Sequence, residues 1–345
     1  MAIIYGARTD RLINAFDGVT NDADTIFGDG ESESIYGLGG DDMIKGGGGA
    51  DRLYGGAGID TAIYIDSSDG VVVSLGAGRG AGGSAEGDQL YQIENVTGSD
   101  YRDELYGDAN GNTLRGEGGD DLIKGGGGSD RLYGGAGGDS LVIDGLDGDF
   151  VDGGDGNDTL SFEVSDGHLH HHPGVNVDLS SGHFGWGLRL GPVPRDEPPT
   201  IVNIENVVGT QWVDTMVGND ADNILLGYGG TDRLHGGDGA DIIDGGDGTD
   251  FIWGDAGNDH LWGGDGDDFF HFERNEGSVD LGHDIIYDFG AGDRIVVDDT
   301  ISFASLRASM RQVGDDVVIT FDANNSITLA NTWLSSISSA DFLFE

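Results

Sequence analysis

The chain has 345 residues and a formal net charge of −48, from 64 acidic and 16 basic side chains. With 67 glycines, 37% hydrophobic residues and no cysteine, it lacks the material for large ordinary cores, disulfides or thiolate metal sites. Such a negative charge destabilises a compact state unless cations neutralise it, and the few scattered basic residues argue against nucleic acid as a partner.

The N-terminal residues, MAIIYGARTDRLINAF, show no basic segment followed by an apolar core. We therefore expect no cleaved signal peptide. No apolar run approaches the length that spans a membrane, so no membrane insertion is expected either. The chain is then either retained inside the cell or exported by a route that reads another signal.

A nine-residue period defines three arrays, which we assign to residues 1–63, 98–163 and 209–271. In GLGGDDMIK, from Gly37, the acid Asp42 stands at position six and the apolar Ile44 at position eight. The acids at position six are Asp24, Glu33, Asp42, Asp51 and Asp60, then Asp103, Asp121, Asp130, Asp139, Asp149 and Asp158, then Asp214, Asp232, Asp241, Asp250, Asp259 and Asp268. Asn112 and Asn223 hold the same position, and the period slips by one residue before Asp149.

This pattern predicts turns that bind a hard cation. One apolar residue per nonapeptide suits the inward position of a short strand and not a helix face. Glycines permit positive φ and close packing, so six residues can form a tight turn whose carbonyl oxygens converge beside the acid. Carboxylate and carbonyl oxygens suit Ca²⁺ better than Zn²⁺ or copper. We expect all the position-six acids to be metal ligands, each turn being followed by a short parallel strand.

The runs of GGxGxDxUx resemble the calcium-binding nonapeptides of the RTX (repeats-in-toxin, hemolysin-type) family, over roughly half of the chain. The resemblance implies an all-β fold, a right-handed parallel β-roll with two nonapeptides in each coil and several Ca²⁺ ions between successive turns. It also implies a secreted, extracellular protein. Its partner during export would be a type I exporter, which reads a C-terminal signal from an unfolded chain.

Between the arrays, residues 64–97 are expected to form a connecting β segment, and residues 164–208 are a longer counterpart with an insertion. All five prolines and five of the nine histidines fall in this second segment. Its candidate catalytic residues are His168, His170, His172, His183, Arg189 and Arg195, with His171 beside them, and Phe184 and Trp186 are candidates for stacking on a sugar ring. Imidazole bases and carboxylate-binding guanidinium groups together suit an acidic polysaccharide as substrate.

Three alternatives stay open for this insertion: a solvated surface loop, a catalytic or substrate site, and a metal site. Adjacent histidines on an extended strand point to opposite faces, which disfavours a zinc site made of sequence neighbours. The proline-rich part also suits a rigid lid or a partner-binding loop. Trp253 and Trp262 end neighbouring nonapeptides, and we expect them to pack on the roll and not to form an exposed patch.

Residues 272–345 are expected to form a β-rich cap that contains the secretion signal. Segments such as HDIIYDFGAGDRIVV alternate apolar and polar residues, as short strands do. This part, including DFGAGD at Asp288–Asp293, resembles the C-terminal segment of serralysin-type proteases. No HExxH motif occurs, so proteolysis is not implied.

Two functional hypotheses follow. The first is a secreted, calcium-dependent polysaccharide lyase that cleaves uronate glycans by β-elimination, with a base that removes the proton beside the carboxylate. A uronate epimerase is a variant of it, although the separate catalytic module of alginate epimerases is missing. The second is a non-catalytic extracellular calcium-binding protein in a matrix, on a surface or in host interaction. The sequence does not decide whether the chain is an enzyme.

Overall fold

The computed structural model describes residues 3–5, 12–13, 18–144, 148–162, 174–186, 201–272 and 281–345. The chain forms two compact units. Unit 1 comprises Met1–Ser165 with Thr200–Ile204, and unit 2 comprises Asp166–Pro199 with Glu205–Glu345. Among the described residues, no helix has the length and apolar character needed to span a membrane.

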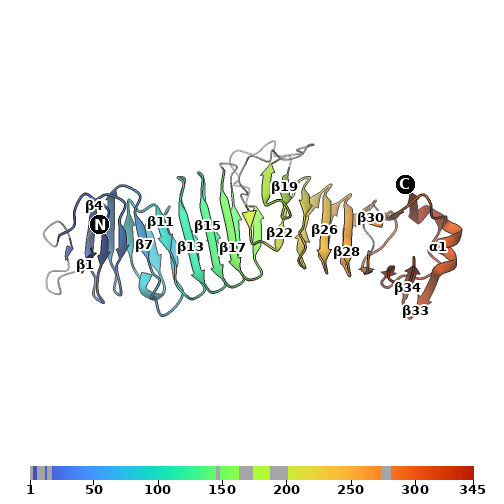
Figure 1. Ribbon diagram of the computed structural model, residues 1–345, viewed down its shortest axis with the longest axis horizontal. Coiled ribbons are helices and arrows are strands. Elements are labelled where there is room, and N and C mark those ends of the chain that lie inside the picture. Colours follow the sequence, from blue (N-terminus) through green and yellow to red (C-terminus); the bar gives the residue numbers. More distant parts are fainter. Residues whose placement is uncertain are drawn as a thin grey trace. The chain divides into compact units, whose positions relative to one another are not determined.

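Unit 1 is built from two parallel sheets between which successive strands alternate. The first sheet contains, in spatial order, β1 (Ile3–Tyr5), β3 (Thr25–Phe27), β5 (Met43–Lys45), β7 (Thr61–Ile63), β11 (Asn95–Thr97), β13 (Thr113–Gly118), β15 (Arg131–Ala136), β17 (Phe150–Asp155) and β21 (Ile201–Val202). The second contains β2 (Leu12–Ile13), β4 (Ser34–Gly39), β6 (Arg52–Ala57), β10 (Gln89–Tyr91), β9 (Arg79–Ala81), β8 (Val72–Ser74), β12 (Glu104–Tyr106), β14 (Leu122–Lys124), β16 (Ser140–Ile143) and β18 (Thr159–Phe162). Strands β13, β15 and β17 run side by side in Figure 1.

Unit 2 repeats this arrangement. One sheet contains β20 (His183–Trp186), β19 (Val175–Asp178), β23 (Thr215–Val217), β26 (Arg233–Gly239), β28 (Phe251–Gly257), β30 (Phe269–Phe272), β32 (Arg294–Val297) and β36 (Phe342–Phe344). The other contains β22 (Asn206–Val208), β24 (Ile224–Leu226), β27 (Ile242–Gly248), β29 (His260–Gly266), β31 (His283–Ile286), β35 (Ser326–Leu329), β34 (Asp316–Thr320) and β33 (Met310–Val313), with β25 (Gly229–Gly230) paired to β27.

In each unit, the core is a row of position-eight side chains between the two sheets of that unit. Ile44, Leu53, Ile123, Leu234 and Ile252 are each 0% exposed. Their neighbours at positions seven and nine are half-buried or exposed, because successive side chains of a strand point to opposite faces. Burial of each aliphatic side chain contributes about 1.5–3 kcal/mol to the free energy of unfolding. The thin core is therefore stabilised because the same small contribution is repeated from one nonapeptide to the next.

Strand register confirms the predicted parallel β-roll with two nonapeptides in each coil. Leu114 pairs with Leu132, 18 residues later, and Leu132 with Val151, so the one-residue slip before Asp149 is absorbed without loss of register. Many strands are longer than the three residues expected. Strands β26–β29 continue through the glycine turn, because the peptides of that turn also pair with the adjacent coil, as Gly246 does with Gly264.

Residues 64–97 are built into the roll of unit 1 by an antiparallel hairpin, in which Ser74 of β8 lies opposite Arg79 of β9. Unit 2 contains its counterpart, in which Asp178 of β19 lies opposite His183 of β20. Glycines with positive φ make both turns possible, Gly78 at 63° and Gly182 at 69°.

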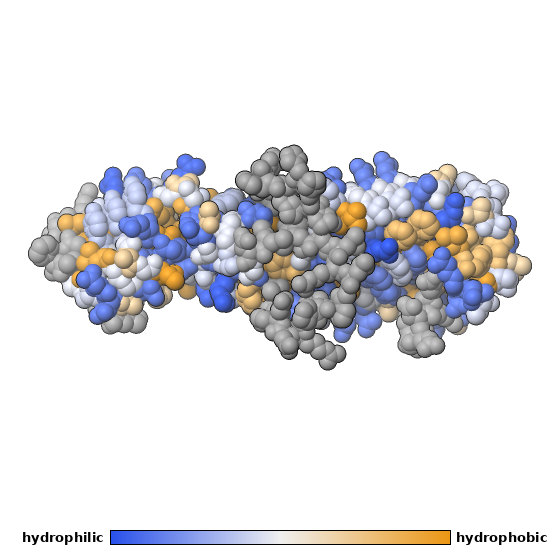
Figure 2. Space-filling model, turned by 90° about the horizontal axis from the view of Figure 1, so that it is seen from above, coloured by the Kyte–Doolittle hydropathy of each residue, from blue (hydrophilic) through white to orange (hydrophobic). Residues whose placement is uncertain are grey.

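The C-terminal part of unit 2 completes the roll with mixed structure. Strands β33, β34 and β35 are antiparallel to one another, and β35 continues the parallel sheet beside β31. Helix α1 (Phe303–Ser309) packs on β34, and two single 3₁₀ turns occur at Gly83–Ala85 (η2, unit 1) and Ser339–Asp341 (η3). Hydrophobic residues gather over this part in Figure 2. Val313 and Trp333, which belong to it, are more than half exposed.

Candidate metal centres

Every position-six acid predicted from the sequence is buried in its turn. Glu33 is the most accessible, at 7% exposed, and Asp51, Asp60, Asp232 and Asp250 are 0% exposed. Position six shares its side of the chain with position eight, so the same alternation that buries the core residue also buries the acid. A row of anionic groups therefore runs along each edge of the roll.

In most of these acids one carboxylate oxygen ties successive coils together. The backbone N–H of Asp24 donates to Oδ1 of Asp42 (2.7 Å), and that of Asp42 donates to Oδ1 of Asp60 (2.8 Å). The same contact joins Asp232 to Asp250 at 2.8 Å. In these three contacts the donor lies 18 residues before its acceptor, which is the length of one coil.

The second oxygen lacks a hydrogen-bond partner in many of these carboxylates. Oδ2 is buried and unpartnered in Asp42, Asp51, Asp60, Asp121, Asp130, Asp139, Asp232, Asp241, Asp250, Asp259 and Asp268. An unpartnered polar atom in the interior costs about 1–3 kcal/mol, and more when it is charged. A regular row of such oxygens indicates positions where a cation binds.

Glycine at position one leaves room for that cation. A Cβ on Gly245 would lie 2.5 Å from Oδ2 of Asp250 and 2.7 Å from the carbonyl oxygen of Gly263 in the next coil. Gly37 and Gly236 stand in the same relation to their own acids and carbonyls. A carboxylate and a carbonyl oxygen thus converge on a space that any side chain would fill, which is a donor set suited to Ca²⁺.

Carboxylates alone do not form these centres. No group of three or more His, Cys, Asp or Glu side chains is close enough to hold a metal within the described parts of the chain. Backbone carbonyl oxygens must therefore supply much of the coordination. This requirement explains the glycine-rich turn, because only residues free to take unusual φ angles can aim their carbonyls inward.

Burial also raises the pKa of these acids. The pKa of Asp232 is raised to about 8, because burial penalises the charged form and the charges of Asp214 and Asp250 add to it, against a hydrogen bond from the Asp214 backbone. The pKa values of Asp241 and Asp268 are raised to about 7, chiefly by burial. A bound divalent cation would favour the charged carboxylates.

Four acids that the repeat did not predict join the same ladder; one of them, Glu94, accepts through Oε2 from the backbone N–H of Asp60 (2.8 Å) and stands two residues before the buried Val96. Asp88, Asp284 and Asp293 accept through Oδ1 from the backbone N–H groups of Asp51 (2.8 Å), Asp259 (3.0 Å) and Asp268 (3.1 Å). Each stands two residues before a buried apolar residue, Leu90, Ile286 or Ile295. That spacing was the available signal, but these acids lie outside the three arrays of the nine-residue period.

Most of the candidate catalytic residues lie outside the described residues: His168, His170, His171, His172, Arg189 and Arg195. Of Trp186 only the backbone, in β20, is described. The sequence placed His183 and Phe184 among added residues, and the structure corrects this. They lie opposite Asp178 and Val177 in the hairpin that both units share.

The tryptophans at position nine pack on the roll, as expected. Trp253 stacks between His235 and His271, with ring centroids 4.2 and 3.9 Å apart. Trp262 stacks on Tyr287 at 4.3 Å. The rings of successive coils cover one another, so these residues stabilise the stack and present ring edges rather than open faces.

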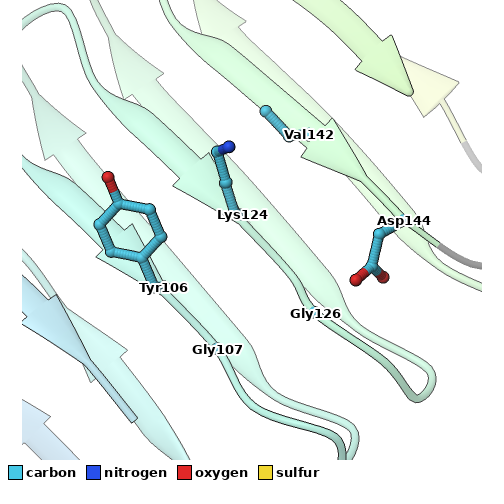
Figure 3. A pocket seen from close by; sticks show the side chains of 6 residues that line it. All are labelled: Tyr106, Gly107, Lys124, Gly126, Val142 and Asp144. Carbon is cyan, nitrogen blue, oxygen red and sulfur yellow. The ribbon is translucent and has the colours of Figure 1, made fainter. Parts of the chain in front are cut away.

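A small cavity of about 190 Å³ lies on the second sheet of unit 1 (Figure 3). It is lined by position-nine side chains of three neighbouring strands, Tyr106, Lys124 and Val142, together with Asp144. These residues are neither position-six acids nor candidate catalytic residues. Gly107 and Gly126, from the turns of Asn112 and Asp130, complete the lining, so none of the residues predicted to bind metal or substrate lines this cavity.

A family model, described as the RTX calcium-binding nonapeptide repeat (4 copies), matches residues 27–62, 106–141, 142–163, 213–243 and 244–274. These segments hold all the position-six acids except Asp24 and Asp103. The resemblance is confirmed over these segments, which contain RTX calcium-binding repeats, and the cofactor is Ca²⁺ in several copies. The match ends at residue 274, so the serralysin-like character of the C-terminal part stays a prediction.

No curated protein matches the chain. Among solved structures, the extracellular lipase LipA from Serratia marcescens is similar, with 18% sequence identity over 73% of this chain and 40% of that one, and a TM-score of 0.26. The chain thus spans less than half the length of that lipase. A likeness of this size carries no argument about activity.

Proposed function

We propose that this chain is an extracellular β-roll whose coils are joined by Ca²⁺ at the turns where Oδ2 of the position-six carboxylate is buried and unpartnered. That row of oxygens, each beside a glycine-lined space, is the observation that carries the proposal. When bound, Ca²⁺ supplies positive charge shared by the carboxylate and carbonyl oxygens. Asp149 and Asp158 stay predictions as ligands.

Within each centre the two carboxylate oxygens, the carbonyl oxygen and the glycine have different roles. Oδ1 accepts a backbone hydrogen bond from the preceding coil, which fixes the carboxylate in place. Oδ2 and a carbonyl oxygen face the space beside position one, and the glycine there keeps it free. Because only the folded roll brings these groups together, metal binding stabilises the native state by mass action.

The direct test is calcium-dependent folding. We expect circular dichroism to show a largely unfolded chain with chelator and a β-rich chain once millimolar Ca²⁺ is added. An unchanged spectrum would refute calcium as the folding cofactor.

A matched pair of variants localises the effect to the turns. Gly245→Ala places a methyl group between Asp250 and Gly263 and should shift the calcium midpoint upward. Gly229→Ala, whose Cβ would meet nothing closer than 3.5 Å, should leave the midpoint nearly unchanged.

Export by a type I exporter is the second part of the proposal. RTX proteins are typically secreted, and an unfolded state at low calcium keeps the chain in a form that can be exported. We expect deletion of residues 302–345 to retain the protein in the producing cell. Export of the truncated chain at the normal level would refute this route.

Uronate lyase activity stays a hypothesis beside a non-catalytic matrix, surface or host-interaction role. The described hairpin contributes one feature to it: both ring nitrogens of His183 are buried without a hydrogen-bond partner. An imidazole in this state can accept a proton if substrate reaches it. Incubation with a panel of uronate glycans, followed by ultraviolet absorbance of unsaturated product, decides between the two roles, with His183→Ala as the paired variant.

A further inference from the structure

Within the described residues, six turns satisfy the position-six side chain through a hydrogen bond from their own backbone. The backbone N–H of position two donates to it in all six: Thr20 to Asp24 Oδ2 (2.8 Å), Asp29 to Glu33 Oε2 (3.4 Å), Ser99 to Asp103 Oδ2 (2.5 Å), Asp108 to Asn112 Oδ1 (2.8 Å), Thr210 to Asp214 Oδ2 (2.6 Å) and Asn219 to Asn223 Oδ1 (2.8 Å). We call these the closed turns. They are residues 19–24 and 28–33, 98–103 and 107–112, and 209–214 and 218–223.

The side chain at position two completes each closed turn. It is Ser, Thr, Asp or Asn in all six, and it accepts a hydrogen bond from the backbone two residues later, as Thr210 does from Trp212 (3.1 Å) and Asp108 from Asn110 (2.8 Å). In the turn of Thr210 the hydroxyl also donates to Oδ1 of Asp214 at 3.0 Å. These turns are held by their own hydrogen bonds.

The turns whose position-six Oδ2 is unpartnered, which we call the open turns, have the opposite backbone at position two. Gly56, Gly135 and Gly237 have φ of 111°, 120° and 107° there, and even Leu38 and Tyr228 take 76° and 68°. Every open turn has a positive φ at this position, and none of the six closed turns does. The backbone therefore separates two classes of turn that share the same period.

A closed turn offers poor coordination to a cation. The N–H hydrogen lies against the oxygen lone pair that an open turn keeps for the metal. Two closed turns carry neutral asparagine at position six. Nδ2 of Asn223 donates to the carbonyl oxygen of Glu205 in the preceding coil (2.7 Å), and Nδ2 of Asn112 does so to Glu94 (2.8 Å). The amide thus joins two coils through hydrogen bonds and needs no metal.

We propose that the six closed turns bind no Ca²⁺ and form a metal-independent first coil for each of the three arrays. They occur in pairs, one turn on each side of the roll, and each pair immediately precedes the open turns of its array. Calcium loading then begins at the second coil of every array, against a coil already held by hydrogen bonds. This inference rests on the proposed role of the open turns as calcium centres.

The test compares matched alanine variants of the full chain in the third array. Asp214 and Asn223 belong to closed turns, and Asp232 and Asp241 are the position-six acids 18 residues later, on the same sides of the roll. Bound ⁴⁵Ca per chain is measured by equilibrium dialysis at saturating calcium, with circular dichroism to establish folding. We expect Asp232→Ala and Asp241→Ala each to lose at least one ion per chain, and Asp214→Ala and Asn223→Ala to keep the parent number.

The outcomes separate the two proposals. If either closed-turn variant loses as much calcium as its open-turn partner, the closed turns are metal sites and the inference is wrong. If no variant loses calcium, the assignment of ligands under the proposed function fails, and the inference fails with it. Should Asp214→Ala not fold, Asn223→Ala decides the question, because it removes no charge.

Discussion

At the scale of single residues, the roll accepts strain at position two of its open turns. Leu38, Glu117 and Tyr228 occupy the left-handed region, where a residue with a Cβ loses about 1–2 kcal/mol relative to glycine. Each stands in the first open turn after a closed pair. Because glycine is the usual residue at this position, the three side chains are not required by the turn.

Replacing Tyr228 by glycine should therefore stabilise the protein. The side chain is 52% exposed, so little buried surface is lost, and we expect a gain of about 1 kcal/mol and a lower calcium midpoint. Urea unfolding at fixed calcium measures the gain. Tyr101, which is 49% exposed and has no positive φ, provides the control, since Tyr101→Gly should destabilise the fold. A loss of stability in Tyr228→Gly would show that the strain is not relieved.

The period predicted the buried acids well because position six is separated from the core residue by a fixed two residues. It missed Asp88, Glu94, Asp284 and Asp293 because they lie outside the three nine-residue arrays, although they accept the same backbone hydrogen bond. It also gave Asp214 and Asp232 the same role. An aspartate can accept a hydrogen bond from a backbone N–H or bind a metal. The two turns differ at position two, which is Thr210 in the turn of Asp214 and Tyr228, with its positive φ, in the turn of Asp232.

At the scale of elements, strands were predictable and their connections were not. Each core residue marks a strand, but strands such as β26 continue into the glycine turn because neighbouring coils pair there too. Helix α1 was not predicted, since seven residues show little helical period; Ser302 begins it by accepting from the backbone N–H of Ser305 at 3.2 Å. The shared hairpin became visible only through register, which placed His183 opposite Asp178.

At the scale of the whole molecule, the net charge and the buried acids act together. In the absence of calcium the folded state must either bury many charged carboxylates or protonate them. Burial raises the pKa of Asp121 and Asp232 to about 8, and of Asp130 to about 7, from an ordinary value of 3.8. Calcium and protons therefore compete for the same carboxylates, and each can replace the other in favouring the fold.

Without calcium, acidification should promote folding. Between the ordinary pKa and the raised ones, the folded state binds more protons than the unfolded chain, so its stability falls as pH rises through this window. In chelator, circular dichroism should show β structure increasing as pH is lowered from 8 to about 5, which stays above the pI of about 4.1. Lower pH also reduces the repulsion among the 64 acidic groups, which acts in the same direction.

Saturating calcium should remove most of this pH dependence, which provides the control. Calcium holds the same carboxylates in the charged form, so the folded state, like the unfolded chain, then binds few protons between about pH 5 and 8. Urea unfolding at saturating calcium should therefore give nearly the same stability across this range, while the calcium midpoint of folding should fall as the pH is lowered, because protons supply part of the stabilisation that calcium otherwise supplies. A general loss of charge would act equally in both series, so equal slopes with and without calcium would show that the buried acids are not the groups through which calcium stabilises the roll.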